Sequence, residues 1–274
     1  MRRAAPRLGA VQESLLVPLY ARAAAARAGG GLLDDPHAVA VVDSLDYDFG
    51  RLAGTRNLFG TVLRTLVFDA WTREFMERSP GGTVVELGAG LSTRFERVDD
   101  GRVRWLDVDL PDVVDLRGAF FPDGERRRAV AASVTDPAWT EHVLRLPPPY
   151  LLIAEAVLAY LPEDGVRQVF ALAGDRLPGS ALAVDTIGRE LLAEQDDPEV
   201  LGRLSARMRW CTDDPRTAQR WHPGVALRRS VDFGRLPPSV AGRLRPEHRR
   251  ALAAYEARSP GRVRAYRLNL YGFG

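Results

Sequence analysis

The sequence predicts an α/β fold built on a doubly wound, mainly parallel sheet. Short apolar runs, each bounded by turn residues or charges, alternate with helical stretches through the middle of the chain, as expected when crossover helices join parallel strands. Two of these runs are continuous rather than alternating, which is typical of strands covered on both faces. The 274 residues, 46% of them hydrophobic, suffice for a large core. The predicted parallel strands are Thr83–Leu87, Val103–Val108, Ala129–Val134, Leu151–Val157 and Ala181–Ile187.

Three helical stretches are expected before the first strand. Apolar residues recur at helical spacing in Gln12–Arg27, Asp35–Leu45 and Asn57–Arg78. Mostly helical residues therefore fill the chain up to about residue 80, and such a block is expected to cover a cleft. The Arg-Arg start and the Ala-rich stretch after it resemble an export signal, but polar residues and Pro18 interrupt the apolar part. An N-terminal helix is therefore expected instead.

Helices are also expected between and after the parallel strands. Pro111–Phe120 and Pro162–Leu177 each open with a proline that suits the first helical turn, so both are predicted to be crossover helices. Glu190–Met208 has helical spacing, and the irregular stretch Arg209–Pro223 follows it.

Two late strands complete the predicted sheet. They are Val225–Phe233 and Val263–Tyr271, and the second alternates as an antiparallel strand does. An arginine-rich helical connection joins them. No linker divides the sequence, so residues 1–274 are predicted to form a single domain.

Composition excludes several kinds of chemistry. The chain has 38 basic and 36 acidic side chains, a formal charge of +2 that creates no field for nucleic acid or an acidic membrane. Every basic residue is arginine, which excludes a lysine Schiff base or a Walker lysine. The chain has one cysteine, Cys211, which excludes an internal disulfide and a zinc ribbon. A single cysteine is consistent with a reducing cytoplasm. No metal site is expected. No stretch approaches the ~20 uncharged residues of a membrane span.

The strongest motif is a strand that ends in an acid and enters a Gly-x-Gly turn. Glu86 precedes Gly88, Ala89 and Gly90, whose glycines let the backbone approach a ligand closely. A dinucleotide-binding loop would place a third glycine where Thr93 stands. Glu86 would also repel a pyrophosphate. A ligand that is cationic at this end fits better.

A second acidic element follows about twenty residues later, where the next strand finishes with Asp107 and Asp109 on one face. A carboxylate at the end of the second strand is where a nucleotide ribose is gripped. Together with the glycine turn, this acid favours S-adenosylmethionine over a nicotinamide dinucleotide.

A third acid, Glu155, interrupts an apolar run near the end of the fourth predicted strand. Ligands of open sheets bind outside such strand ends, and a buried carboxylate needs a partner. It is either part of a site or a salt-bridged structural acid.

These motifs together resemble the leucine carboxyl methyltransferase family, most closely its bacterial branch of polyketide O-methyltransferases of the tetracenomycin type. The resemblance extends over most of the chain. It is carried by Glu13–Arg22, Asp34–Pro36, Arg64–Asp69, Glu86–Phe95, Asp107–Pro111, Asp136–Trp139, Ala154–Leu161 and Gly272–Gly274.

The resemblance implies a Rossmann-like class I methyltransferase with a seven-stranded sheet, a helical cover over residues 1–80 and a lid insertion at about 188–224. It implies S-adenosyl-L-methionine as cofactor, held at the glycine turn from Glu86 to Gly90. Arg64 would bind the methionine carboxylate, a pairing that suits a guanidinium. Asp107 and Asp109 would lie near the ribose, Ser133 and Val134 beside the adenine, and Glu155 near the methionine part.

Family members also bring a basic residue from the first helix, for which Arg22 is the loose candidate here. No docking surface for a C-terminal peptide is evident, so the expected partner is a small-molecule acceptor, with the chain a monomer or homodimer. The predicted activity is methyl transfer to a carboxylate or hydroxyl of a polyketide-like natural product. A hydroxyl acceptor would need a base, for which Tyr160, His222 and His142 are candidates. The alternatives are a nicotinamide-dependent oxidoreductase and a cofactor-binding scaffold without methyl transfer.

Overall fold

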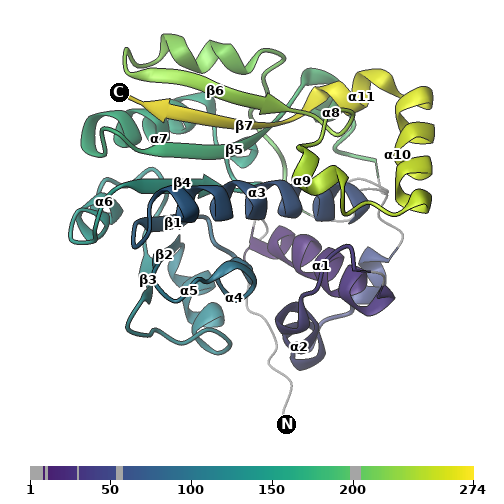
Figure 1. Cartoon of the computed structure of the whole chain (residues 1–274), viewed down its shortest axis with the longest axis horizontal. Coiled ribbons are helices and arrows are strands. Elements are labelled where there is room, and N and C mark those ends of the chain that lie inside the picture. Colours follow the sequence, from purple (N-terminus) through teal and green to yellow (C-terminus); the bar gives the residue numbers. More distant parts are fainter. Residues whose placement is uncertain (1–8, 10–11, 30, 54–57, 198–204) are drawn as a thin grey trace.

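The computed structural model describes residues 9, 12–29, 31–53, 58–197 and 205–274, which contain a seven-stranded sheet with the strand order β3-β2-β1-β4-β5-β7-β6 (Figure 1). The first five strands run parallel, and β7 is antiparallel to both β5 and β6. The order reverses between β1 and β4, which creates the switch point where open α/β sheets bind ligands. The strands are β1 Thr83–Leu87, β2 Arg104–Asp109, β3 Arg127–Ala131, β4 Tyr150–Ala154, β5 Ala181–Ile187, β6 Val225–Val231 and β7 Tyr266–Phe273.

Helices precede the sheet, connect its strands and follow β6. Before β1 come η1 Gln12–Leu15, α1 Leu16–Ala28, α2 Pro36–Ser44, η2 Phe49–Leu52 and α3 Leu58–Arg78. Between β1 and β5 come α4 Arg94–Val98, α5 Pro111–Gly118, α6 Ala138–Val143, η3 Leu158–Tyr160 and α7 Glu163–Arg176. The later helices are α8 Arg189–Ala193, η4 Pro215–Arg220, α9 Pro238–Ala241, α10 Pro246–Arg258 and α11 Pro260–Ala265.

The sheet buries both faces, because successive strand residues point to opposite sides. Val85 and Leu152 face a core cluster that includes side chains of α6, α7 and η4. Their neighbours Val84 and Leu151 face a second cluster built mainly on α3, with α9 at its edge. These positions are between 0 and 1% exposed, which explains why the central strands are continuously apolar in the sequence.

Helices from the N-terminal and C-terminal parts of the chain lie at the same side of the sheet. In Figure 1 the purple helices α1 and α2 and the yellow helices α10 and α11 lie beside the carboxyl ends of the parallel strands. The N-terminal helices form a third core cluster with Leu91, which follows β1, and Phe121, which follows α5. The helical block before the sheet therefore packs next to the loops that leave β1 and β2.

Three predicted strands end earlier than expected: the late strand predicted to reach Phe233 ends at Val231, and two of the first five also end early. The third ends at Ala131, not Val134, and the fourth ends at Ala154, not Val157. Val134 is nonetheless 7% exposed and belongs to the core, so its apolarity reflects burial in a loop. Ala156 has a φ of 56°, a left-handed conformation that ends a strand.

The predictions after β5 were less accurate. The helix expected at Glu190–Met208 is wrong as one element, because α8 ends at Ala193 and turns follow; residues 198–204 lie outside the described residues. The last strand begins at Tyr266 rather than Val263, since α11 continues to Ala265. Asn57, the expected start of α3, also lies outside the described residues.

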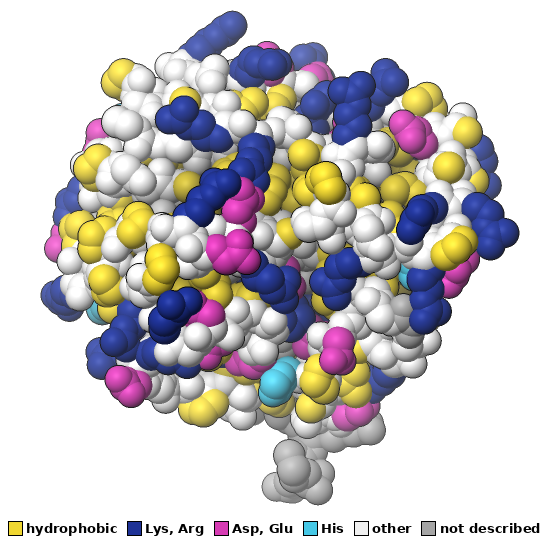
Figure 2. Space-filling model, viewed as in Figure 1, with side chains coloured by type: hydrophobic (Ala, Val, Ile, Leu, Met, Phe, Trp, Pro, Cys, Tyr) yellow, Lys and Arg dark blue, Asp and Glu magenta, His cyan; other side chains and the backbone are white. Residues whose placement is uncertain are grey.

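The surface is mixed in charge. Figure 2 shows arginines and acids interspersed with apolar side chains over one face of the molecule, consistent with the formal charge of +2. Within the residues that the structure describes, no helix combines the length and the apolarity needed to cross a bilayer.

Candidate functional site

A cavity of about 810 Å³ lies at the switch point, beyond the carboxyl ends of β1, β2 and β4. This volume is typical of a small-molecule site, for which about 300–1,000 Å³ is usual. Side chains of α1, α3 and α10 complete its wall. The sequence-predicted residues that line it are Arg64, Glu86, Gly88, Ala89, Gly90, Asp109, Ser133, Val134, Glu155 and Tyr160.

The glycine turn forms one side of the cavity and is tightly packed. The Gly88 N–H donates to the Val108 carbonyl at 2.8 Å, which ties the turn to β2. Gly88 has a φ of 70°, and a Cβ there would come within 2.4 Å of the Val157 side chain. This position therefore accommodates only glycine, for both conformational and steric reasons.

Asp109 closes the same side from the end of β2. Its carboxylate accepts the Gly90 N–H at 2.7 Å and the Leu110 N–H at 2.7 Å. Burial raises the pKa of Asp109 in spite of these two donors. A carboxylate that lines a cavity with no arginine bonded to it retains acceptor capacity for the hydroxyls of a ligand.

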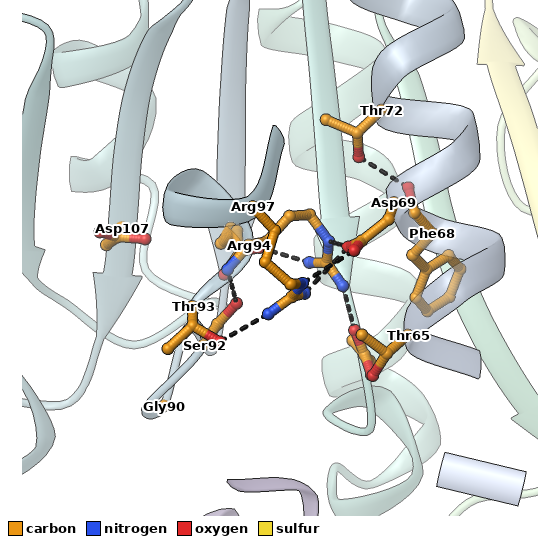
Figure 3. Close-up of polar contacts among 12 residues, drawn as sticks. Thr65, Phe68, Asp69, Thr72, Gly90, Ser92, Thr93, Arg94, Arg97 and Asp107 are labelled. Atoms are coloured by element: carbon orange, nitrogen blue, oxygen red, sulfur yellow. Dashed lines mark hydrogen bonds and ion pairs between the residues drawn. The ribbon is translucent and has the colours of Figure 1, made fainter. Parts of the chain in front are cut away.

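Arg94 organises the acids beside the glycine turn. Figure 3 shows its guanidinium between Asp69 of α3 and the turn after β1. Arg94 donates to Asp69 at 2.9 Å and also to Glu86 and Glu155. Although burial alone would lower the pKa of Arg94, these carboxylates raise it. The acid of the E-x-G-x-G motif is therefore neutralised from within the protein.

Glu155 connects Arg94 to a second arginine, Arg64 of α3. Arg64 Nε donates to Glu155 Oε1 at 2.8 Å, and Arg64 Nη1 donates to the Tyr266 hydroxyl at 2.8 Å. Burial alone would raise the pKa of Glu155, but the guanidiniums of Arg64 and Arg94 lower it to about 2. Glu155 is therefore an ionised carboxylate on the cavity wall.

Arg22 of α1 is a buried cation whose neighbours compensate it incompletely. It is 4% exposed and lines the cavity, and its Nη2 donates to the Leu91 carbonyl at 2.7 Å. Its Nε lies 3.2 Å from Asp35 Oδ2, yet makes no hydrogen bond within the described residues. Burial lowers the pKa of Arg22 to about 10 in spite of Asp35. An anionic ligand group entering the cavity would supply the missing compensation.

Asp107, predicted to contact the cofactor, is not at the cavity. It is 1% exposed and accepts from Arg117 Nη2 at 3.0 Å and Arg127 Nε at 2.7 Å (Figure 3 shows it apart from Arg94). Arg117 in turn donates to the Gly90 carbonyl at 2.8 Å. Asp107 therefore supports the glycine turn through Arg117. It lies on the same face of β2 as Asp109 but two residues before the end of the strand, so its side chain does not reach the cavity.

The structure does not bring the candidate histidines to the cavity. His222 lies just before β6, whose first residue Val225 pairs with Phe273, so it sits at the opposite edge of the parallel strands. Its Nε2 lies 3.1 Å from Asp175 Oδ1 of α7. His142 is exposed on α6. Nowhere in the described residues do three His, Cys, Asp or Glu side chains gather as a set of metal ligands.

Two cavity residues, Asp185 and Tyr266, were missed in the sequence. Asp185 lies near the end of β5 and Tyr266 at the start of β7, and both line the cavity. Asp185 interrupts an apolar run just as Glu155 does, so the same signal could have found it. Tyr266 carries no such signal, because aromatic residues are common in strands.

Comparison with known proteins identifies the family. The family model for leucine carboxyl methyltransferase matches residues 16–174, more than half of the chain. The tetracenomycin polyketide synthesis O-methyltransferase TcmP of Streptomyces glaucescens is 32% identical over 80% of this chain and 82% of its own length. The S-adenosyl-L-methionine-dependent methyltransferase dpfgK of Gibberella zeae is 28% identical over 84% of this chain and 86% of its own.

Solved structures share the fold at low sequence identity. The methyltransferase domain of bacterial CtHen1 superposes with a TM-score of 0.52 at 12% identity, covering 77% of this chain and 99% of that domain. A methyltransferase from Anabaena variabilis gives a TM-score of 0.50 at 8% identity, covering 79% of this chain and 92% of that one. The sheet is thus that of the class I methyltransferases. The chain belongs to the leucine carboxyl methyltransferase family and is an S-adenosyl-L-methionine-dependent methyltransferase.

Proposed function

We propose that this methyltransferase transfers a methyl group to a carboxylate or hydroxyl oxygen of a small natural-product intermediate. The observation that carries the proposal is that one cavity has two chemically different ends. The polar end, at the glycine turn, suits a charged nucleoside. The part lined by α10 and by Phe233 is mainly apolar and aromatic, and Arg258 and Arg262 also contribute to the lining. The relative named as a polyketide O-methyltransferase supports the same acceptor class.

At the polar end, the residues fit S-adenosylmethionine. Arg22 and Arg64 would hold its methionine carboxylate, since both guanidiniums line the cavity and Arg22 is incompletely compensated. Asp109 would accept from the ribose hydroxyls. Ser133 and Val134, in the loop after β3, would lie against the adenine, and Glu155 would close the site near the methionine part.

At the other end, the wall suits an apolar acceptor. Phe59 of α3, Ile187 of β5, Leu252 and Tyr255 of α10, and Phe233 beyond β6 line this part. These residues come from elements that the chain brings together only at the carboxyl edge of the sheet. With an acceptor bound, these apolar side chains would exclude water from the reacting groups, which strengthens electrostatic interactions inside the site.

The chemistry requires alignment more than proton transfer. S-adenosylmethionine supplies, when bound, an electrophilic methyl group on a sulfonium. The chain's part is to hold the acceptor oxygen in line with that methyl group. A carboxylate acceptor is already ionised at neutral pH and needs no base. Burial raises the pKa of Tyr160, so its hydroxyl would orient an acceptor oxygen by hydrogen bonding rather than remove a proton.

The nicotinamide alternative finds less support in the glycine turn. A dinucleotide pyrophosphate is bound by backbone N–H groups after the first strand. Here the Gly90 N–H is bonded to Asp109 at 2.7 Å and the Arg94 N–H to the Ser92 hydroxyl at 3.2 Å. Thr93, at the place of the third glycine, is fully buried and donates to Asp35 at 2.6 Å.

Calorimetry with S-adenosylhomocysteine tests the cofactor end. We expect the wild-type protein to bind it and Asp109→Ala to weaken binding by about 10- to 100-fold, the value of one or two hydrogen bonds to a charged group. Asp115→Ala, on an exposed position of α5, is the matched control and should bind as wild type does. Equal binding by Asp109→Ala would contradict the proposed ribose contact.

A labelled-methyl assay tests the reaction. Carboxylic acids and phenols of polyketide type are offered as acceptors, and the products are treated with mild base, because methyl esters lose methanol whereas aryl ethers do not. We expect transfer to at least one class. Binding of S-adenosylhomocysteine without transfer to any acceptor would favour the scaffold alternative, and binding of a nicotinamide dinucleotide in its place would favour the oxidoreductase.

A further inference from the structure

The cavity wall contains a closed ring of contacts among its lining residues. Starting from Arg64, Nε donates to Glu155 at 2.8 Å, and the chain continues from Glu155 to Ala156. The Ala156 N–H donates to Asp185 Oδ1 at 2.7 Å, and Asp185 Oδ2 accepts from the Tyr266 hydroxyl. The Tyr266 oxygen accepts from Arg64 Nη1 at 2.8 Å, which closes the ring.

The ring fixes the guanidinium of Arg64 at two points. Nε is held by Glu155 and Nη1 by Tyr266, and within the described part of the chain Nη2 makes no hydrogen bond. Arg64 is 7% exposed and lines the cavity, so Nη2 is the donor available to a ligand anion. A planar guanidinium held through two of its three nitrogens has its third donor direction set.

The ring also stabilises an unfavourable backbone conformation. Ala156 is the one non-glycine residue with a positive φ in the described chain, at 56°, a conformation that is strained for a residue with a Cβ. The hydrogen bond that the Ala156 N–H donates to Asp185, on the neighbouring strand β5, holds this turn. Because Ala156 follows Glu155 directly, the turn also sets where the Glu155 carboxylate meets Arg64.

Tyr266 is itself held rigidly. Its ring stacks on Phe233 with centroids 5.3 Å apart and planes 13° apart. Burial raises the pKa of Tyr266 well above its usual range, so the hydroxyl remains protonated and can donate to Asp185 while it accepts from Arg64.

We propose that Asp185 and Tyr266 are positioning residues, which orient Arg64 and the Glu155–Ala156 turn toward the carboxylate of the bound cofactor. Neither residue is assigned a contact with the cofactor. The inference rests on the proposed role of Arg64, and it extends the cofactor site to β5 and to β7, which lies beyond residues 16–174 that the family model matches.

The test compares two ligands and two matched variants. S-adenosylhomocysteine carries the amino-acid carboxylate, and 5′-methylthioadenosine lacks it. Tyr266→Phe removes only the hydroxyl of the ring, and Tyr271→Phe makes the same change on the same strand. Tyr271 is buried and its hydroxyl donates to the Pro215 carbonyl at 2.7 Å, on the far side of the sheet from Arg64.

We expect Tyr266→Phe to raise the dissociation constant of S-adenosylhomocysteine about tenfold, as loss of a hydrogen bond to a charged group does. Binding of 5′-methylthioadenosine should stay within about twofold of wild type, and Tyr271→Phe should leave both ligands unaffected. A general loosening of the sheet would weaken both ligands, and either that result or no effect on S-adenosylhomocysteine would overturn the proposal.

A second variant pair tests the backbone part of the ring. Asp185→Ala removes the acceptor of the Ala156 N–H, and we expect a loss in S-adenosylhomocysteine affinity of about tenfold or more. Adding Ala156→Gly, which allows a positive φ without steric cost, should restore part of that loss. No recovery in the double variant would overturn the role assigned to Asp185 at this turn. If wild type bound neither ligand, the proposed function itself would fail, which separates the two outcomes.

Discussion

Glu155 illustrates how a buried acid remains charged in this protein. Its carboxylate meets Arg64 and Arg94, and these cations lower its pKa from 4.5 to about 2 against the effect of burial. Because the folded state binds this proton less readily than the unfolded chain, stability rises with pH between about 2 and 4.5 and is lost on acidification. The contribution of Glu155 is therefore fully present at neutral pH.

We predict that Glu155→Gln lowers the free energy of unfolding at pH 7 by about 3 kcal/mol, because two buried cations lose a shared partner. The gap to wild type should shrink as pH falls from about 4.5 toward 2. Urea denaturation at a series of pH values measures this difference in the free energy of unfolding. Glu163→Gln, which alters an exposed pair with Arg167 on α7, is the control and should show a small gap. A gap that stays constant with pH would contradict the assignment.

Whereas Glu155 is fully compensated by protein cations, Arg22 is predicted to gain its missing partner from a bound ligand. It is buried, it has an Nε without a hydrogen bond in the described chain, and its pKa is lowered to about 10 by burial. We expect Arg22→Gln to weaken S-adenosylhomocysteine binding by about 10- to 100-fold while 5′-methylthioadenosine binds as before. Arg27→Gln, on the exposed end of the same helix where it pairs with Asp43, is the control. Calorimetry with both ligands decides, and equal losses for the two ligands would exclude a carboxylate contact.

At the scale of elements, the sequence predicted where the strands lie in the chain better than it predicted the residues at which they end. Strands β1 and β5 have the predicted bounds, because turn residues or charges flank their apolar runs. Hydrophobic periodicity could not show that the chain leaves the sheet at Ala131 and Ala154, because the loops that follow are buried as well. Those loops line the cavity, so the errors fall where the backbone departs from regular structure to meet a ligand.

Some site residues could be located from the sequence, and others could not. The turn from Glu86 to Gly90 and Asp109 could be found, because strand-end motifs have local signatures. Asp107 was misplaced, because it shares a face of β2 with Asp109 and the sequence pattern does not show that only the acid at the end of the strand reaches the cavity. His222 was misplaced because the direction of β6 relative to the parallel strands cannot be deduced from composition.

The glycine turn yields a prediction about how β1 meets the loop after β4. Gly88→Ala should lower the free energy of unfolding by about 2–4 kcal/mol, the sum of a left-handed alanine and overpacking against Val157. Gly101→Ala is the control, because Gly101 has a φ of 78° and no neighbour within 4 Å of a Cβ, so it should cost about 1–2 kcal/mol.

Val157→Ala in the Gly88→Ala background should recover the overpacking part and leave the conformational part. Chemical denaturation of the single and double variants measures both. If the double variant were no more stable than Gly88→Ala, the contact with Val157 would not be the source of the cost.

At the scale of the whole molecule, the cavity is lined by residues from both the N-terminal and the C-terminal parts of the chain. Its lining extends from Gln12 in η1 to Tyr266 in β7, so closing it requires that the N-terminal helices and the C-terminal helices dock on the same edge of the sheet (Figure 1). The apolar contacts of α1 are made largely with the helical cluster that also holds Leu91 and Phe121. We therefore expect ligand binding to be coupled to how firmly these helices are docked.

Hydrogen exchange tests that coupling. Without ligand, Arg22 of α1 is compensated incompletely, so we expect that part of the free energy that could hold α1 against the sheet becomes available only when an anion binds. We predict that S-adenosylhomocysteine slows amide exchange in α1 and in the turn from Gly88 to Ser92. The control region is η4, which packs on the other side of the sheet, together with the edge strand β6. Neither contributes a residue to the cavity's described lining, so exchange there should not change. Binding that slowed exchange equally in both regions would indicate general stabilisation rather than docking of the cover.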